Sequence, residues 1–358
     1  MTTGALQPGA VVGILGGGQL GRMLSVAAAR LGLRCHIYDP APDPPAAQVA
    51  WRVTTADWDD TDNLAAFAAS VDVVTYEFEN VPAESLDAVE SAAPLRPGRA
   101  ALRTSQDRLV EKDFLASLGL ATAPYADIPD AAALTAALET IGAPAILKTR
   151  RLGYDGKGQA RIADRADAAA AFAAMAGAPA ILEGLVDFTA EISVIGARGI
   201  DGQVACFDPG ENLHRGGILA STTVPAQVKQ SVATDAVLLT GRLLNALDYV
   251  GVIGVELFVT PGGLVVNEFA PRVHNSGHWT QNGCAVDQFE QHIRAIAGWP
   301  LGDGRRHADV VMENLIGDDV ASARDRASQP GAALHLYGKA QTRPGRKMGH
   351  INRVSPRG

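Results

Sequence analysis

Two apolar segments in the second half of the chain each carry a single glutamate. Residues 252–259 and 264–269 are rich in β-branched and aromatic residues, and a turn containing proline and two glycines separates them, which predicts a β-hairpin. Glu256 lies in the first segment and Glu268 in the second. A carboxylate inside an apolar strand is costly unless it is paired or bound to a metal. The sequence therefore predicts two hairpin carboxylates that share a cation.

The loop length decides whether the two glutamates meet. A five-residue loop, residues 260–264, would place Glu256 opposite Glu268 at roughly 5 Å. A four-residue loop would place Asn267 opposite Glu256 instead, and a bulge near the glycines would then have to set the register. Facing carboxylates repel, and Mg²⁺ bridging the phosphates of ATP would remove the conflict. Two separately solvated glutamates are the alternative.

A first glycine cluster follows the predicted strand at residues 11–15 and opens a helical segment. Gly16, Gly18 and Gly21 satisfy G-x-G-x-x-G, and Asp39 ends the next predicted strand. This pattern is typical of a dinucleotide-binding turn, with the acidic residue on a ribose hydroxyl. Two other interpretations stay open: a tight strand-to-helix turn without a ligand, and a turn that binds another anion such as a sugar phosphate.

A second glycine cluster, residues 153–158, lies between a predicted strand ending at Lys148 and another at residues 159–162. A glycine loop between two strands can fold over a triphosphate and offer it backbone N–H groups, and Lys148 would add a positive charge. The spacing is not that of a P-loop. A plain exposed hairpin is the alternative.

Polar and basic residues gather after the second glutamate and near the C-terminus. Residues 271–279 leave the predicted strand as a polar loop, in which Arg272 and His274 could hold a small anion. Lys339 and the pair Arg346 and Lys347 form a basic cluster, which is either a phosphate-binding pocket or a solvated turn.

Length, charge and cysteine content narrow the class of protein. A chain of 358 residues predicts two or three subdomains. The net charge of −8 argues against a broad nucleic-acid surface, which needs clustered Lys and Arg. Cys35, Cys206 and Cys284 form no CxxC pair, which favours a reducing compartment. No apolar run reaches bilayer length. We expect a cytoplasmic protein without nucleic-acid or membrane partners.

Several strings together closely resemble the 5-(carboxyamino)imidazole ribonucleotide synthetase family of purine biosynthesis, in the ATP-grasp superfamily. They are GILGGGQLGRM from Gly13, YEFENV from Tyr76, QDR from Gln106, GYDGKGQ from Gly153, NEFAPRVHNSGHWTQNG from Asn267 and RPGRKMGH from Arg343. The resemblance implies an α/β (α+β) ATP-grasp fold. Its parts would be an N-terminal Rossmann-like domain (residues 1–105), a small mobile lid (106–185) and a larger C-terminal domain (186–358) with the metal site.

The resemblance also implies a reaction. Members of this family convert ATP, bicarbonate and 5-aminoimidazole ribonucleotide into the carboxylated ribonucleotide, ADP and phosphate through carboxyphosphate. Relatives with this architecture are usually homodimers. The chain stops soon after the string GHINRV, where members of the family are expected to continue through a further strand and helix.

Residue roles follow only where a motif matches. The ATP set would be Arg108, Lys148, Gly153, Tyr154, Asp155, Gly156, Lys157, Gly158, Glu183, Gly184, Leu185, Val186, Glu191, His214, Asn267 and Glu268. Glu256 and Glu268 would bind Mg²⁺, or Mn²⁺ in its place. Arg272, His274, Asn275 and Asp155 would be catalytic, the first three around bicarbonate or carboxyphosphate. The ribonucleotide would contact Gln19, Leu20 and Glu77, and its 5′-phosphate Lys339, Arg346 and Lys347.

Three other functions remain to be separated from this one. Formate-dependent glycinamide ribonucleotide formyltransferase shares the fold, the paired glutamates and the basic C-terminal cluster. An NAD-dependent dehydrogenase would use Gly16, Gly18 and Gly21, and would leave the paired glutamates without a role. A catalytically inactive ATP-sensing protein is the third.

Overall fold

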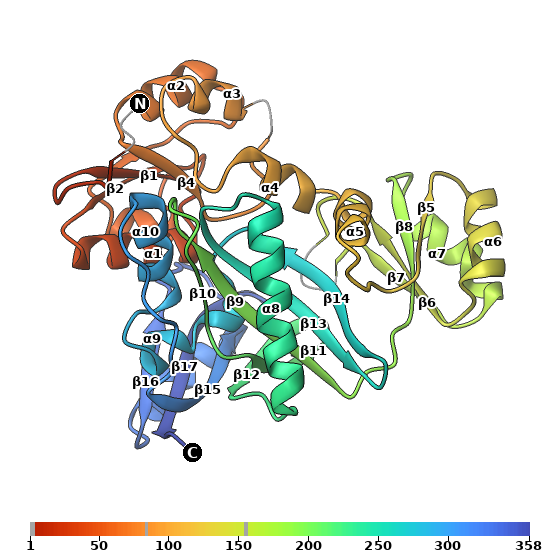
Figure 1. Ribbon diagram of the computed structural model, residues 1–358. Coiled ribbons are helices and arrows are strands. Elements are labelled where there is room, and N and C mark those ends of the chain that lie inside the picture. Colours follow the sequence, from red (N-terminus) through yellow and green to blue (C-terminus); the bar gives the residue numbers. More distant parts are fainter. Residues whose placement is uncertain (1–3, 83–84, 154–156) are drawn as a thin grey trace.

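Three β-sheets organise the part of the chain that the computed structural model describes, residues 4–82, 85–153 and 157–358. Figure 1 shows a parallel sheet near the N-terminus, a long sheet that runs through the centre of the molecule, and a small sheet that projects to one side. The fold class expected from the sequence, a mixed α/β arrangement, is confirmed.

The N-terminal region forms a four-stranded parallel sheet in the order β3-β2-β1-β4. Its elements are β1 (Val11–Leu15), α1 (Gln19–Arg30), β2 (Arg34–Tyr38), η1 (Pro45–Gln48), β3 (Arg52–Thr54), α2 (Thr61–Ala69), β4 (Val73–Tyr76), α3 (Ser85–Glu90) and α4 (Arg99–Ser105). The central strands β1 and β4 are mostly apolar and largely buried because both faces of a parallel sheet are covered. The glycine turn lies between β1 and α1, at the carboxyl edge of this sheet.

The small sheet is antiparallel, in the order β5-β8-β6-β7. This region comprises α5 (Arg108–Ser117), β5 (Tyr125–Ile128), α6 (Ala131–Thr140), β6 (Ala145–Thr149), β7 (Gln159–Ile162), η2 (Arg165–Asp167), α7 (Ala168–Ala174) and β8 (Ala180–Gly184). Helices α6 and α7 pack on it and enclose a separate hydrophobic core that includes Leu134, Leu147 and Leu182. In Figure 1 this unit lies apart from the other two sheets.

The long sheet runs in the order β14-β13-β9-β11-β12-β15-β17-β16, and β10 pairs with β9. Its strands are β9 (Ala190–Arg198), β10 (Val204–Cys206), β11 (Gly210–Arg215), β12 (Ile218–Val224), β13 (Gly251–Thr260), β14 (Gly263–Ala270), β15 (Ala308–Ile316), β16 (Ala332–Leu336) and β17 (Lys347–Pro356). Between them lie α8 (Gln230–Ala246), η3 (Asn275–Gly277), α9 (Thr280–Gly283), α10 (Gln288–Ala297), η4 (Gly317–Ser322) and α11 (Ala323–Ala327).

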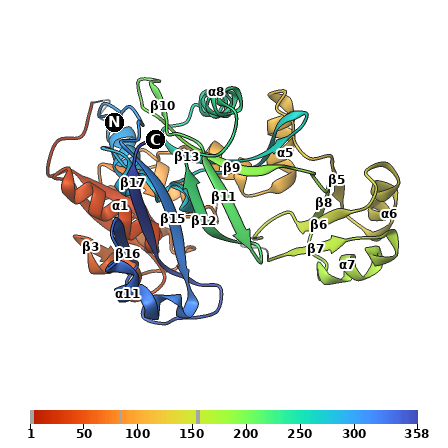
Figure 2. The ribbon, with the colours of Figure 1, turned by 90° about the horizontal axis from the view of Figure 1, so that it is seen from below.

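One continuous hydrophobic core joins the parallel sheet to the long sheet. Leu24 of α1 and Ile293 of α10 are both fully buried in it. The two helices pack against each other, and Figure 2 shows α1 beside the far strands of the long sheet. Arg30 at the end of α1 adds an ion pair with Asp287, 2.6 Å between Nη2 and Oδ2. This packing gives the two sheets a fixed relative position.

Helix α5 packs against the long sheet. The domain boundaries predicted at residues 105/106 and 185/186 would place it in the lid, yet its Leu115 is buried in a core formed with β9, β13 and α8. The boundaries themselves stay predictions. Among the described residues no helix is both long enough and apolar enough to cross a lipid bilayer.

The β13–β14 hairpin pairs Glu256 with Glu268, as predicted, but through a different loop. Thr260 pairs with Gly263, so the register of the turn is the one expected to place Asn267 opposite Glu256. A register shift between Glu256 and Leu257 leaves Asn267 without a cross-strand partner and brings Glu268 into line. The bulge thus lies beside the glutamates, and the expectation of a bulge near the glycines was wrong.

Candidate active site

A cleft of about 560 Å³ lies where the three sheets meet. Most of the site residues expected from the sequence line it: Gln19, Leu20, Glu77, Arg108, Lys148, Gly153, Lys157, Glu191, His214, Glu256, Asn267, Glu268, Arg272, His274, Asn275 and Lys347. They come from all three sheets and from the connections between them. Residues far apart in the sequence therefore form one polar surface with both signs of charge.

Glu256 and Glu268 face each other in this cleft in different electrostatic environments. Burial, and then the charge of Glu268, raises the pKa of Glu256 to about 8. Partial burial opposes ionisation of Glu268 as well, yet its pKa falls to about 2 because the guanidinium of Arg108 lies 2.6 Å away, Nη1 to Oε2. The like-charge conflict is therefore relieved at Glu268 and remains at Glu256.

A divalent cation fits this pair. Glu256, Asn267 and Glu268 all line the cleft and offer oxygen atoms, the ligand type that Mg²⁺ and Mn²⁺ prefer. The raised pKa of Glu256 reflects a repulsion that a bound cation would offset. The bulge contributes directly, because it brings Asn267 and Glu268 together opposite a single residue of β13.

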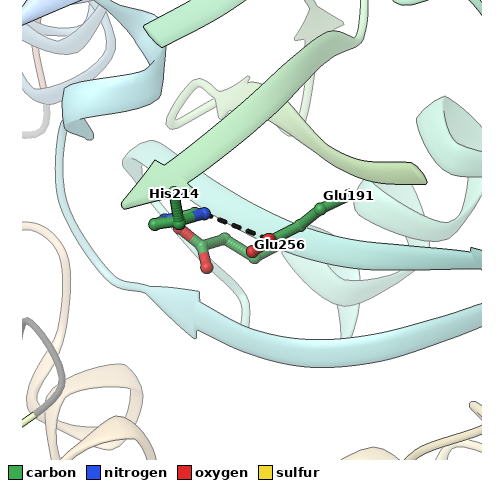
Figure 3. Close-up of side chains that lie close together, drawn as sticks. All are labelled: Glu191, His214 and Glu256. Atoms are coloured by element: carbon green, nitrogen blue, oxygen red, sulfur yellow. Dashed lines mark hydrogen bonds and ion pairs between the residues drawn. The ribbon is translucent and has the colours of Figure 1, made fainter. Parts of the chain in front are cut away.

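Glu256 also belongs to a second group, with Glu191 of β9 and His214 of β11. One ligand atom from each of these side chains lies within 4.8 Å of the other two. Figure 3 shows the side chains pointing toward one another, with a hydrogen bond of 3.0 Å between His214 Nδ1 and Glu191 Oε2. Although burial opposes it, this hydrogen bond and the carboxylate charges raise the pKa of His214. The group forms one wall of the cleft.

A carboxylate between two lysines lies at the base of the small sheet. Glu183 of β8 accepts a hydrogen bond from Lys148 Nζ at 3.0 Å, and Lys112 Nζ lies 3.5 Å from the same oxygen. Burial opposes ionisation, but the two lysine charges lower the pKa of Glu183. Glu183 therefore fixes Lys148, whose side chain reaches the cleft from the strand end.

The side-chain carboxylate of Glu77 occupies the glycine turn. Glu77 accepts hydrogen bonds from the backbone N–H groups of Gly18, Leu20 and Gly21 at 2.8, 3.1 and 3.1 Å. A Cβ atom at Gly16, which has φ of 100°, would lie 2.6 Å from Glu77 Cγ. The glycines thus make room for a carboxylate at the helix N-terminus, the position a dinucleotide pyrophosphate would need. This arrangement contradicts the NAD-binding interpretation of the motif.

The loop after β14 holds its charged residues by specific contacts. Arg272 makes a two-point ion pair with Glu79, 2.5 Å from Nε to Oε2 and 3.1 Å from Nη2 to Oε1. His274 bonds Ser276 Oγ through Nδ1 at 2.8 Å, and Gln288 bonds both backbone groups of His274. Burial, followed by nearby positive charges, lowers the pKa of His274 to about 3, so this side chain is neutral at physiological pH.

Some predicted residues lie outside the lining of the cleft. These are Gly158, Glu183, Gly184, Leu185, Val186, Lys339 and Arg346. Lys339 Nζ donates to the carbonyl of Lys347 at 2.7 Å, and Lys347 itself lines the cleft. Arg346 Nη1 donates to the carbonyl of Gln341. Tyr154, Asp155 and Gly156 fall outside the described residues.

Sequence reasoning missed several residues that build the site. Glu79 and Asn80 line the cleft and lie in the YEFENV string, where only Glu77 was assigned a role. Lys112 and Gln288 hold Asn267 and His274 from outside the cleft, and Glu111 holds Phe269 next to Glu268. Burial distinguishes Glu111 and Lys112 from ordinary charged helix residues, and this burial is visible only in the structure.

Comparisons with known proteins agree with this geometry. Residues 10–106 match the ribonucleotide synthetase preATP-grasp domain, residues 113–289 the ATP-grasp domain, and residues 310–357 the phosphoribosylaminoimidazole carboxylase C-terminal domain. An N5-carboxyaminoimidazole ribonucleotide synthase of Brucella melitensis is 55% identical over 99% of this chain and 98% of that relative. The Pseudomonas aeruginosa enzyme is 45% identical over 95% of this chain and 93% of its own length.

Solved structures give the same result. An ADP complex of N5-carboxyaminoimidazole ribonucleotide synthetase matches with a TM-score of 0.95 and 40% identity, over 99% of this chain and 94% of the other. The Aspergillus clavatus enzyme in complex with ADP and 5-aminoimidazole ribonucleotide matches with a TM-score of 0.92 and 32% identity, over 98% and 94%.

The fold and the cleft define an ATP-grasp enzyme preceded by a preATP-grasp domain. Within that class, the chain belongs to the N5-carboxyaminoimidazole ribonucleotide synthase family.

Proposed function

We propose that the chain catalyses the ATP-dependent carboxylation of 5-aminoimidazole ribonucleotide by bicarbonate. The products are N5-carboxyaminoimidazole ribonucleotide, ADP and phosphate, as in de novo purine biosynthesis. The observation that carries the proposal is the facing pair Glu256 and Glu268 in a cleft that also contains Arg108, Lys148 and Arg272. Such a site can hold a polyphosphate, its cation and a small anion together.

The nucleotide would occupy the side of the cleft nearest the small sheet. Arg108, Lys148 and Lys157 line that side and would neutralise the phosphates, with backbone N–H groups of the glycine loop. Glu191 and His214 would take the ribose hydroxyls, since a hydrogen bond already orients them. Glu183 to Val186 would line the adenine pocket. Glu256 and Glu268 would hold Mg²⁺, which supplies charge neutralisation between the phosphates when bound.

Bicarbonate would lie beside Arg272, His274 and Asn275. An oxygen of bicarbonate attacks the γ-phosphorus, the bond to ADP breaks, and carboxyphosphate forms. Arg272, held by Glu79, would bind the anion and the charge that develops on it. Because His274 is neutral with a pKa of about 3, we assign it to hydrogen bonding and orientation rather than to proton storage.

The ribonucleotide would enter from the parallel sheet. Gln19 and Leu20 line the cleft there, and Glu77 shapes the turn that presents them. Lys347, with Lys339 bonded to its carbonyl and Arg346 beside it, would bind the 5′-phosphate. The exocyclic amine then receives CO₂ from carboxyphosphate, phosphate leaves, and the amine loses a proton. A homodimer in the cytoplasm remains our expectation for the assembly.

The proposal is tested by ADP formation with different substrates. We expect ATP turnover to rise on addition of 5-aminoimidazole ribonucleotide and bicarbonate, and the carboxylated ribonucleotide to accumulate. Turnover with glycinamide ribonucleotide and formate, and none with the first pair, would overturn the proposal in favour of the formyltransferase. No turnover with either pair would favour an ATP-sensing protein.

A further inference from the structure

One face of α5 contacts three consecutive residues of β14 at the bulge. Arg108, Glu111 and Lys112 have the spacing i, i+3 and i+4, so their side chains lie on the same side of the helix. In Figure 1 this helix lies between the β13–β14 hairpin and the small sheet. Helix α5 is therefore close enough to the bulge for its side chains to contact it.

Each of the three side chains contacts a different residue. Lys112 Nζ donates to the carbonyl of Asn267 at 2.8 Å. Arg108 Nη1 donates to Glu268 Oε2 at 2.6 Å. Glu111 Oε1 accepts from the backbone N–H of Phe269 at 2.7 Å. Two of these contacts satisfy backbone groups of a strand whose ladder the bulge interrupts.

Glu111 and Lys112 are 3% and 2% exposed, which is rare for charged side chains. These buried charges do not contribute to a solvent-exposed surface. Each side chain makes a hydrogen bond to the backbone of β14 that an apolar residue of similar size could not make. Lys112 also lies 3.5 Å from Glu183 Oε2, so it connects the bulge to the small sheet. Glu111 and Lys112 therefore fix the position of the bulge through these polar contacts, more than they stabilise the hydrophobic core.

Without the bulge, the hairpin has an alternative register. The turn pairing of Thr260 with Gly263 would continue to Asn267 opposite Glu256, and Glu268 would then point to the other face of the sheet. The two registers share the same turn, and the contacts from α5 belong only to the bulged one. These contacts thus favour the register in which both glutamates face the cleft.

We propose that Glu111 and Lys112 are positioning residues that hold the Asn267 bulge and thereby set the affinity of the Glu256–Glu268 site for a divalent cation. The inference rests on the proposed function, because that function assigns the cation to this pair. It goes further in naming two residues that lie outside the lining of the cleft. Loss of such supporting contacts typically weakens metal binding about 10–100-fold.

The test measures Mn²⁺ binding by electron paramagnetic resonance in the presence of ADP. Lys112→Met and Glu111→Met keep side-chain size and remove the contacts, and we expect each to weaken Mn²⁺ binding at least about tenfold. Glu111→Gln keeps an acceptor oxygen for the N–H of Phe269 and should bind Mn²⁺ nearly as the unchanged protein does. Lys112→Arg serves if Lys112→Met does not fold, and should weaken binding because the wider guanidinium does not fit between Asn267 and Glu183.

Leu115→Ala is the matched control for destabilisation. Leu115 lies on the same helix, is fully buried and contacts the apolar core. We expect this variant to unfold at a lower temperature with unchanged Mn²⁺ affinity. Amide exchange of residues 267–269 should accelerate in Lys112→Met and Glu111→Met and not in Leu115→Ala.

Glu268→Gln separates failure of this inference from failure of the proposed function. If Glu268→Gln abolishes Mn²⁺ binding while both methionine variants bind as Leu115→Ala does, the positioning role is overturned and the metal assignment stands. If Glu268→Gln binds Mn²⁺ unchanged, the metal assignment itself is overturned. A loss of affinity in the methionine variants, with recovery in Glu111→Gln, supports the inference.

Discussion

The carboxylate of Glu77 lies 2.8 Å from the backbone nitrogen of Gly18, inside the turn that opens α1. Leu20 and Gly21 donate to the same carboxylate, at 3.1 Å each. A turn of this sequence usually presents its N–H groups to a ligand phosphate. Here the end of β4 supplies the anion, and the turn becomes a rigid part of the cleft wall.

Glu77→Gln should destabilise the fold by about 1–3 kcal/mol, because an amide group cannot accept from all three N–H donors and leaves buried donors unpaired. Asp72→Asn is the control, since Asp72 accepts from the N–H of Val11 at an exposed position. Urea unfolding followed by circular dichroism measures both. Equal midpoints for the two variants would contradict the role given to Glu77.

Glu268→Gln should lower ATP turnover at least about 100-fold while the fold is retained, because loss of a direct ligand should cost no less than loss of a supporting contact. Glu139→Gln removes a carboxylate from an exposed ion pair with Arg165 and should leave turnover unchanged. ADP release at ordinary Mg²⁺ concentration is the measurement. Unchanged turnover in Glu268→Gln would remove the metal assignment.

The pKa of Glu256 predicts a pH-dependent stability in the presence of EDTA. Burial and then Glu268 raise this pKa from 4.5 to about 8, so the folded protein holds the proton more tightly than the unfolded chain. The corresponding stability is present below about pH 4.5 and is lost as the pH rises through about 8.

Glu256→Gln cannot titrate, and its melting temperature in EDTA should exceed that of the unchanged protein by an amount that grows from pH 5 to about pH 8 and then levels off. Glu111 has a pKa raised to about 8 as well, by burial and then by Glu268, but it is present in both proteins. Mg²⁺ should reduce the difference, because the cation stabilises ionised Glu256. A difference that does not change with pH would contradict the electrostatic description of the pair.

Arg272→Lys should lower kcat by about 10²–10³, since an ammonium cannot keep both contacts with Glu79 and still present a planar donor pair to an anion. Glu79→Gln keeps acceptor oxygen and loses charge, and should mainly raise KM for bicarbonate. Arg294→Lys is the control, because Arg294 pairs with Glu290 within α10. Steady-state kinetics at varied bicarbonate separates these outcomes.

Local patterns predicted the elements well and the contacts between them poorly. The strands predicted at residues 11–15 and 159–162 match β1 and β7, and the strand predicted to end at Asp39 matches β2, because short strands bounded by turn residues carry their own signal. The facing of Glu256 and Glu268 was predicted from the hairpin pattern and a five-residue loop, and the structure reaches it through a bulge instead. The bulge at Asn267 was not located, because it depends on α5, which is more than 150 residues away in the chain.

The role of Glu77 illustrates the same limit. The glycine motif is identical whether its N–H groups meet a ligand or a side chain, and only the parallel pairing of β4 with β1 brings Glu77 to the turn. The resemblance identified most residues that line the cleft, since those belong to contiguous strings. It did not identify Glu79 as the partner of Arg272, because that contact spans 193 residues.

The single unpaired residue at Asn267 has a consequence for how many donor atoms a hairpin can offer. In regular pairing, side chains alternate between faces, so two neighbours on one strand never point the same way. The extra residue interrupts this alternation at one position, so Asn267 and Glu268 both reach the cleft opposite Glu256. A two-stranded scaffold thereby gains a third oxygen donor without a longer loop or an added strand.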